Sequence, residues 1–300
     1  MPIFQVKNKK AIPLKEKTFE SERELQKFVD ENLDEFFGLK FIKREFGGQG
    51  LSIDTIAYDS ETKGPVLIEY KKDTQVSVID QGIAYLDWLL NHKGDYLILL
   101  EEKLKTKDVN WSQARVVFIA KNYSSHQLRA SGMKGVPFEL WRYDLYENLF
   151  SLQMVETPKS DVFLSSIIKT KAAKEISKEI KTPIVEDHLK KANDKTKELF
   201  EAIRERIFSL DDRIIEKPVT WYIGYKVRYF NFVSVHLFKD KIKIHVRVKK
   251  IDDPKKLFKK IPASYGWGKT PLWYVDIFDQ KNLDYYFSII KQAYEAAPDR

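Results

Sequence analysis

The chain has 300 residues and a mass of 35.3 kDa, a length that predicts one large domain or two ordinary ones. Hydrophobic residues make up 43% and charged residues 32%, which is enough apolar material for a core and excludes a disordered chain. Cysteine is absent, which excludes disulfide scaffolds, cysteine-ligated zinc, iron–sulfur clusters and thiol nucleophiles. No apolar run approaches the roughly 18 residues that span a bilayer, and the apolar stretch at the start is too short for a secretory signal. We therefore expect a soluble, cytoplasmic protein without a membrane partner.

The positive charge is concentrated in the second half of the chain. Residues 1–156 hold 22 lysines and arginines against 24 acidic residues, a net charge of −2, whereas residues 157–300 hold 30 against 20, a net charge of +10. Together they give the formal net charge of +8. A basic surface attracts phosphate whatever the base sequence, so a nucleic acid is one expected partner. Taken alone, the charge is better explained by an ordinary lysine-rich solvated surface.

The first half alternates between helix and strand patterns. Apolar residues at three- and four-residue steps predict a helix over residues 19–37, with Ser21 and Glu24 as a capping box and Gly38 as its end. A glycine-rich turn at 47–50 leads into two predicted strands, 51–59 and 65–72, and a helix follows at 78–93. Residues 95–103 and 114–122 read as further strands, and 138–148 as a strand or short helix. This order predicts an α/β domain over residues 1–156.

The composition changes after residue 156. Residues 157–185 are rich in lysine, serine and threonine, which predicts a linker with a loose helix near 169–180. A helix is expected over 186–208, then strands at 220–230, 232–238, 241–250 and 273–278, and a closing helix at 281–297. This order predicts a smaller α+β domain over residues 186–300, built on an antiparallel sheet.

Three charged side chains stand out on the two strands of the first domain. Asp54 interrupts an otherwise apolar strand, and Glu69 and Lys71 lie two residues apart on the next one, so their side chains share a face. Two carboxylates at adjacent strand ends form a hard oxygen site suited to Mg²⁺ or Mn²⁺, and a lysine beside them could position water or stabilise charge on a phosphate. Gln81 and Tyr85 are one helical turn apart and could both face this site.

This pattern resembles the PD-(D/E)XK nuclease superfamily, with Ile53-Asp54 followed by Glu69-Tyr70-Lys71. The Q-x-x-x-Y element formed by Gln81 and Tyr85 looks like that of the RecB-like branch. The NucS-type endonuclease domain is the most similar, because its first helix begins E-x-x-L, as Glu22 to Leu25 do here. The resemblance covers roughly residues 18–120 and departs from the family name only where Ile53 replaces proline.

Membership would imply a restriction-endonuclease-like mixed sheet with flanking helices, a bound Mg²⁺ or Mn²⁺, and hydrolysis of phosphodiester bonds in DNA. By this resemblance Asp54 and Glu69 become metal ligands, Glu22 an auxiliary ligand, and Lys71 the catalytic lysine. Gln81 and Tyr85 become supporting residues of the catalytic site. Dimerisation is common in the superfamily, because a duplex has two strands to cut, so a homodimer is a further expectation.

Each of these residues also has an ordinary structural explanation. Glu69 and Lys71 could form a solvent-facing cross-strand pair, and Asp54 could sit at an exposed strand edge. Gln81 and Tyr85 could simply belong to an amphipathic helix. Glu22 could be a first-turn carboxylate favoured by the helix dipole, and its neighbour Glu24 is already explained by capping. The joint occurrence of all the residue types in order favours the nuclease interpretation.

The strand at 241–250 alternates strictly between apolar and basic residues, which predicts a row of positive charge along one sheet face. Residues 186–297 resemble an uncharacterised domain family through W-Y-I-G-Y-K, D-P-K-K-L and A-Y-E-A, a likeness that implies no activity. Cationic groups with nearby aromatic side chains such as Tyr225 and Tyr229 suit nucleic acid. A half-buried strand with a solvated face is the alternative. The candidate nucleic-acid-binding residues are Lys226, Arg228, Lys243, His245 and Arg247.

The sequence therefore predicts a metal-dependent DNA endonuclease acting in repair or defence. The first alternative is a non-catalytic nucleic-acid-binding or scaffold protein that retains the nuclease fold. The second is a small-molecule or protein-interaction module with a pocket formed by Trp221, Tyr222, Trp267 and Trp273. The pattern leaves open whether the nucleic acid is DNA or RNA.

Overall fold

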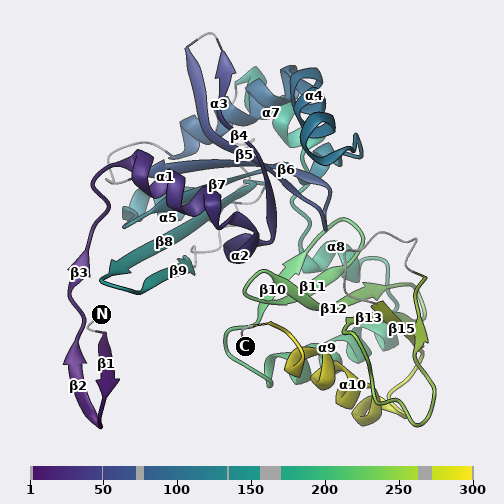
Figure 1. Cartoon of the computed structure of the whole chain (residues 1–300). Coiled ribbons are helices and arrows are strands. Elements are labelled where there is room, and N and C mark those ends of the chain that lie inside the picture. Colours follow the sequence, from purple (N-terminus) through teal and green to yellow (C-terminus); the bar gives the residue numbers. More distant parts are fainter. Residues whose placement is uncertain are drawn as a thin grey trace. The chain divides into compact units, whose positions relative to one another are not determined.

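A computed structural model describes residues 3–48, 50–71, 78–133, 135–155, 170–262 and 272–298 (Figure 1). The chain divides into two compact units. The first unit contains Met1–Asp59 and Lys63–Lys181, and the second contains Ser60–Thr62 and Thr182–Arg300. Of the described part of the chain, no helix is both long and apolar enough to cross a membrane.

The first unit is built around a mixed sheet with the strand order β3-β8-β7-β6-β5-β4, in which β9 pairs with β8. The central strands β6, β7 and β8 are parallel, whereas β4, β5 and β6 pair antiparallel. The strands are β3 (Glu16–Lys17), β4 (Leu39–Gly48), β5 (Leu51–Asp59), β6 (Gly64–Lys71), β7 (Arg115–Ala120), β8 (Phe138–Tyr146) and β9 (Phe150–Met154). The predicted mixed α/β class is confirmed.

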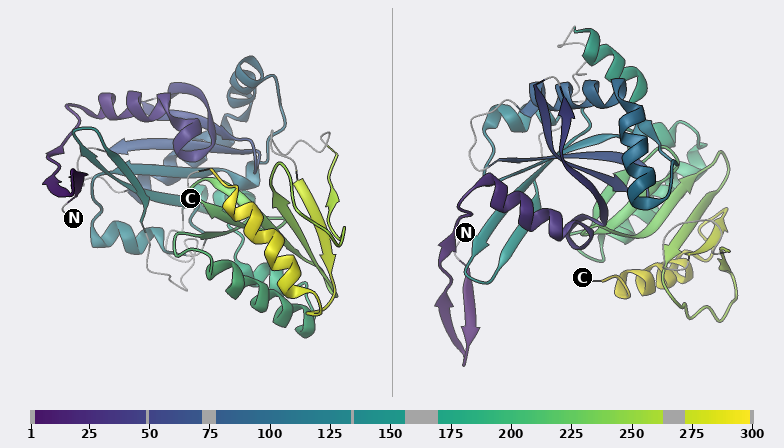
Figure 2. Two further views of the ribbon diagram at one scale, coloured as in Figure 1. Left: turned by 60° about the horizontal axis from the view of Figure 1, so that its bottom comes forward. Right: turned by 45° about the horizontal axis from the view of Figure 1, so that its top comes forward.

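Helices flank both faces of this sheet, because the side chains of β6 alternate between two apolar clusters. Ile68 and Tyr70 pack with Leu25 of α1 (Glu22–Glu31) and Leu33 of α2 (Leu33–Phe37). Leu67 belongs to the opposite cluster, which includes side chains of α3 (Val78–Asn91) and α4 (Lys93–Leu104). Figure 2 shows α1 and the α3–α4 pair on opposite sides of the strands.

The predicted first helix forms, but as two pieces. Ser21 caps α1 by accepting the N–H of Glu24, while the Glu24 carboxylate accepts the N–H of Glu20 instead of closing a full capping box. The chain leaves helical geometry at Asn32 before α2 begins. Gly38 ends α2 with a φ of 67°, a left-handed conformation that glycine adopts without steric cost.

The predicted strand at 95–103 is wrong, because these residues lie within the helix α4. Tyr96 and Leu100, four residues apart, are buried on one side of this helix, whereas Ile98 between them is 58% exposed. The sequence analysis also missed β4 and the N-terminal hairpin of β1 (Phe4–Lys7) and β2 (Lys10–Pro13), whose residues are all exposed. Residues 138–148, predicted as a strand or a short helix, contain the strand β8.

The predicted linker contains a helix that packs in the first unit. Ile176 of helix α7 (Lys171–Glu179) and Ile180, which follows this helix, belong to the same apolar cluster as side chains of α3 and α4. A smaller helix, α5 (Ser125–Ser131), lies between β7 and β8 along the chain.

The second unit is an antiparallel sheet with the order β10-β11-β12-β13-β15-β14 and helices packed on one face. Its strands are β10 (Ile215–Pro218), β11 (Ile223–Val227), β12 (Phe230–Leu237), β13 (Ile242–Arg247), β14 (Lys259–Lys260) and β15 (Leu272–Ile277). The expected helix at 186–208 is divided into α8 (Val185–Leu189) and α9 (Asp194–Phe208), and α10 (Leu283–Glu295) closes the chain. The predicted α+β organisation is confirmed.

Candidate functional site

The strands β5 and β6 stop pairing at the position of Asp54. The antiparallel ladder between them ends at the pair Thr55–Ile68. Beyond it, the Asp54 Oδ2 atom accepts the backbone N–H of Tyr70 at 2.9 Å. The carboxylate thus replaces a backbone acceptor that pairing would otherwise supply, and it is held at the point where the two strands diverge.

Glu69 is the most buried of the predicted site residues, with an exposed fraction of 2%. The Oε1 atom of Glu69 lies 2.6 Å from Lys71 Nζ and accepts a hydrogen bond from Gln81 Nε2 at 2.5 Å. Its Oε2 atom accepts a hydrogen bond from the hydroxyl of Tyr85 at 2.7 Å. Gln81 Nε2 also donates to the Tyr85 oxygen at 2.7 Å. Alternation on β6 places Glu69 and Lys71 on the face covered by α3, and the one-turn spacing on α3 brings Gln81 and Tyr85 to the same carboxylate.

Burial and charge shift the titration of these groups. Burial raises the pKa of Asp54 to about 7, and the neighbouring negative charges of Glu69 and Glu22 act in the same direction. Burial lowers the pKa of Lys71, but its hydrogen bond and ion pair with Glu69 outweigh that effect, so the pKa is raised overall. Burial, and then Glu69, raise the pKa of the Tyr85 hydroxyl. The site therefore combines a stably charged lysine with a carboxyl group that is costly to ionise.

Glu22 lies in the exposed first turn of α1, close enough for its charge to raise the pKa values of Asp54 and Lys71. Within the described ranges, however, no three histidine or acidic side chains come close enough together to hold a metal ion. The structure thus brings Asp54, Glu69, Lys71, Gln81 and Tyr85 into one cluster and leaves Glu22 at its margin.

The donor chemistry of the cluster still suits a divalent cation. Asp54 and Glu69 present carboxylate oxygens, the ligands that Mg²⁺ and Mn²⁺ prefer. The pKa of the Asp54 carboxyl group is raised by burial and also by its acidic neighbours, so additional positive charge beside it would be stabilising. These two residues would hold the ion.

A buried polar network on the α1 side of the sheet was missed by the sequence analysis. Gln26 Nε2 donates to the backbone oxygen of Asp54 at 2.6 Å. Asp30 Oδ1 accepts the hydroxyls of Thr55 and Tyr70, each at 2.8 Å, and its Oδ2 atom pairs with Arg44. Helix α1 therefore fixes both strands directly next to the candidate site. Gln26 and Asp30 are four residues apart beside the apolar positions of α1, and this polar pair was the available signal.

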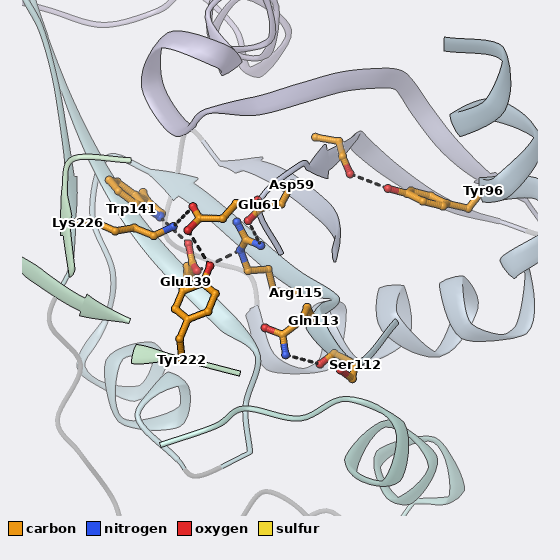
Figure 3. Close-up of polar contacts among 11 residues, drawn as sticks. Asp59, Glu61, Tyr96, Ser112, Gln113, Arg115, Glu139, Trp141, Tyr222 and Lys226 are labelled. Carbon is orange, nitrogen blue, oxygen red and sulfur yellow. Dashed lines mark hydrogen bonds and ion pairs between the residues drawn. The ribbon is translucent and has the colours of Figure 1, made fainter. Parts of the chain in front are cut away.

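The predicted basic face of the second unit contains the expected residues, and three of the cations pair with acidic side chains. The side chains of Lys226 and Arg247 are 19% and 13% exposed and pair with Glu61, as Figure 3 shows for Lys226. Lys243 Nζ lies 3.8 Å from Asp276. Arg228 is exposed beside the ring of Tyr229.

His245 is half-buried, and its Nδ1 atom lies 2.8 Å from His236 Nε2. Burial lowers the pKa of His245 to about 4 and that of His236 to about 3, so neither ring carries charge at neutral pH. Tyr225 does not lie on this face, because it is fully buried in the core on the other side of the sheet.

The aromatic residues considered as a small-molecule pocket do not gather in the described structure. Trp221 is 73% exposed. Tyr222 contacts His236, whereas Trp273 packs against the core on the opposite side of the sheet. Trp267 lies outside the described residues.

Comparison with known proteins places the chain in a family that spans both units. It is 34% identical over 301 residues to an uncharacterized protein of Haemophilus influenzae, and the match covers 98% of this chain and 99% of that protein. The chain belongs to the family of that protein. Residues 185–297 also match the model of DUF5655, a domain of unknown function, in agreement with the likeness predicted from the sequence.

Two solved structures are similar to part of the chain. One is a complex of EndoMS with double-stranded DNA, with 19% identity, a TM-score of 0.25 and coverage of 47% of this chain and 46% of that chain. The other is a repair endonuclease from Pyrococcus abyssi, with 18% identity, a TM-score of 0.26 and coverage of 48% and 50%. The chain thus spans about half the length of each.

Proposed function

We propose that this protein is a metal-dependent nuclease that hydrolyses phosphodiester bonds in DNA. The observation that carries the proposal is the cluster of Asp54, Glu69 and Lys71 at the divergence of β5 and β6, with Gln81 and Tyr85 bonded to Glu69. A carboxyl group of raised pKa, that of Asp54, beside a charged lysine is typical of functional sites. The motif resemblance over residues 18–120, which includes these same residues and the helix start at Glu22, supports the same activity.

The residues of the cluster have separate roles in this proposal. Asp54 and Glu69 would hold a Mg²⁺ or Mn²⁺ ion, which would supply Lewis-acid polarisation of the phosphodiester. Lys71 keeps its proton and stabilises the negative charge that develops on the phosphate oxygens. Tyr85 and Gln81 fix the Glu69 carboxylate in one orientation, so that little reorganisation is needed during the reaction.

A cleavage assay tests the proposal. Wild type and Lys71→Ala are incubated with supercoiled, linear, single-stranded and branched DNA, in Mg²⁺, Mn²⁺ or EDTA. We expect cleavage by the wild type only with metal, and a loss of about 100-fold or more for Lys71→Ala. Lys103→Ala, at an exposed position of α4, is the matched control and should cleave normally. Cleavage that persists in EDTA or in Lys71→Ala would contradict the proposal.

A second candidate is a nucleic-acid-binding protein that keeps the fold without turnover. The observation that favours it is that both oxygens of Glu69 already have protein partners. DNA binding without cleavage of any substrate, together with no Mn²⁺ binding at millimolar concentration, would favour this alternative. An RNA substrate is tested by adding RNA to the same assay.

We further propose that the second unit contributes affinity for the nucleic acid through Lys226, Arg228, Lys243, His245 and Arg247. Arg228 is the exposed member of the set beside an aromatic ring, an arrangement suited to base stacking and phosphate attraction. Arg228→Ala should weaken binding and reduce its salt dependence by about one phosphate contact. Repair or defence would be the biological setting, and a homodimer is testable by sedimentation.

A further inference from the structure

Four donor groups of the second unit converge on a single carboxylate, that of Glu61. The hydroxyl of Tyr222 lies 2.8 Å and Asn231 Nδ2 lies 2.5 Å from Glu61 Oε1. Lys226 Nζ lies 3.2 Å from Oε2, and Arg247 Nη2 approaches Oε1 to 3.8 Å. Figure 3 shows Lys226 and Tyr222 directed at the Glu61 side chain. The cluster lies wholly among residues that pack as the second unit.

The donors are built into the fold and are not chance neighbours on a surface. Tyr222 and Asn231 are 3% and 1% exposed. Lys226 projects from β11, Asn231 from β12 and Arg247 from β13, so three adjacent strands place their polar groups at one spot. Buried donors are costly unless an acceptor is present, and the sheet has therefore been arranged around an anion.

Glu61 satisfies this site incompletely. One carboxylate, that of Glu61, faces two cations, Lys226 and Arg247. Within the described structure, the buried Arg247 Nε atom, a donor that an anion could accept, has no hydrogen-bond partner. The distance from Arg247 Nη2 to Glu61 exceeds that of a hydrogen bond. Asp276 lies opposite Lys243, four residues along β13 from Arg247, and it pairs with Lys241 and Lys243.

We infer that this cluster is a phosphate-binding site of the second unit and that Glu61 is its internal competitor. A phosphate group carries up to two negative charges at neutral pH and offers oxygens in a tetrahedral arrangement, so it matches both cations and can accept two parallel N–H groups from the edge of a guanidinium. The inference rests on the proposed affinity of the second unit for nucleic acid, and it names the chemical group recognised. Free phosphate and a phosphate of a nucleic acid share this chemistry.

Neutralising the competitor in the full-length protein tests the inference. Binding of inorganic phosphate to wild type and Glu61→Gln is measured by isothermal titration calorimetry at constant ionic strength. If Glu61 occupies the site about nine-tenths of the time, its removal should tighten the apparent Kd for phosphate about tenfold. Glu198→Gln, an exposed glutamate of α9, is the matched control and should bind phosphate as the wild type does.

A double variant ties the gain to the cluster. In Glu61→Gln/Lys226→Gln the tightened binding should be lost, and circular dichroism confirms that the protein is folded. Lys226 is the partly exposed cation of the pair, so its removal disturbs packing less than that of Arg247. Equal affinity in wild type and Glu61→Gln, or tight binding retained in the double variant, would overturn the inference.

Two further ligands identify the source of the phosphate. An oligonucleotide with a 5′-phosphate and its 5′-hydroxyl counterpart are compared on Glu61→Gln. Preference for the phosphorylated form indicates a nucleic-acid end, and equal affinity alongside binding of inorganic phosphate indicates free phosphate as the ligand. Acetate binding as tightly as phosphate would overturn the assignment to phosphate. None of these readouts depends on cleavage, so failure of the nuclease proposal and failure of this inference are distinguishable.

Discussion

Replacing Asp54 by asparagine should change stability in a way that depends on pH. The raised pKa of Asp54, about 7 against an ordinary value of 3.8, means that the folded protein retains a proton which the unfolded chain has released between these values. The free energy of unfolding of the wild type therefore falls as pH rises through this window. Asparagine keeps an acceptor for the N–H of Tyr70 and does not titrate, so the variant escapes that loss.

The magnitude follows from the pKa. Between pH 5 and pH 8, the folded and unfolded states differ in the protonation of Asp54 only up to its folded pKa of about 7, which is about two pH units. At about 1.36 kcal/mol for each unit, this corresponds to a loss of roughly 2.7 kcal/mol in the free energy of unfolding. Asp54 is only half-buried, and water screens part of its unfavourable interactions. We therefore expect Asp54→Asn to gain about 2 kcal/mol relative to wild type between pH 5 and pH 8.

Urea denaturation in EDTA at pH 5 and pH 8 measures this difference. The exposed Asp95→Asn in α4 is the control for the substitution itself. A stability difference between wild type and Asp54→Asn that stays constant within about 0.5 kcal/mol across this range would refute the electrostatic reasoning. It would also remove one reason for placing a cation beside Asp54.

Four other outcomes follow from the contacts described. Mg²⁺ at ten times its Kd should stabilise the wild type by about 1.4 kcal/mol in a thermal shift assay and have no such effect on Asp54→Asn. Tyr85→Phe, which removes a partner of Glu69, should lower kcat for DNA cleavage by about 10- to 100-fold with KM unchanged. Burial lowers the pKa of His245 from 6.5 to about 4. Between these two pH values, His245 is therefore protonated in the unfolded chain but not in the folded protein. Acidification should therefore destabilise wild type by about 2 kcal/mol more than His245→Gln in urea denaturation. Ile244→Ala, at a fully buried position, should lower the free energy of unfolding by about 2–5 kcal/mol by the same method.

The local patterns were sufficient to predict the elements that carry the candidate site. Strand alternation placed Glu69 and Lys71 on one face, and helical spacing placed Gln81 and Tyr85 together, so these four residues meet as expected. The apolar run in 95–103 misled the prediction, because its length suits both a strand and a buried helix segment. Only the packing of Tyr96 and Leu100 into the core distinguishes the two.

Contacts between distant parts of the sequence could not be predicted. Glu61 and Asn231 are separated by 170 positions, and no periodicity in either segment indicates that one accepts a hydrogen bond from the other. The position of Glu61 changes the interpretation of the basic residues on one face of the second unit's sheet. Lys226 and Arg247 have an acidic neighbour there, whereas the strand pattern predicted a solvated face. Asp30 is similar, because its burial depends on Tyr70 and Arg44 from other elements.

The position of α7 also has a consequence for biosynthesis. Ile176 and Ile180 belong to the apolar cluster that packs against α3 and α4 in the first unit. The last long strand of this unit, β8, ends much earlier in the chain, at Tyr146. As the chain emerges from the ribosome, its N-terminal part folds first, but this cluster stays incomplete until about residue 180 has been released. A nascent chain stalled before that point exposes apolar surface where α7 will pack, and a chaperone can recognise it there.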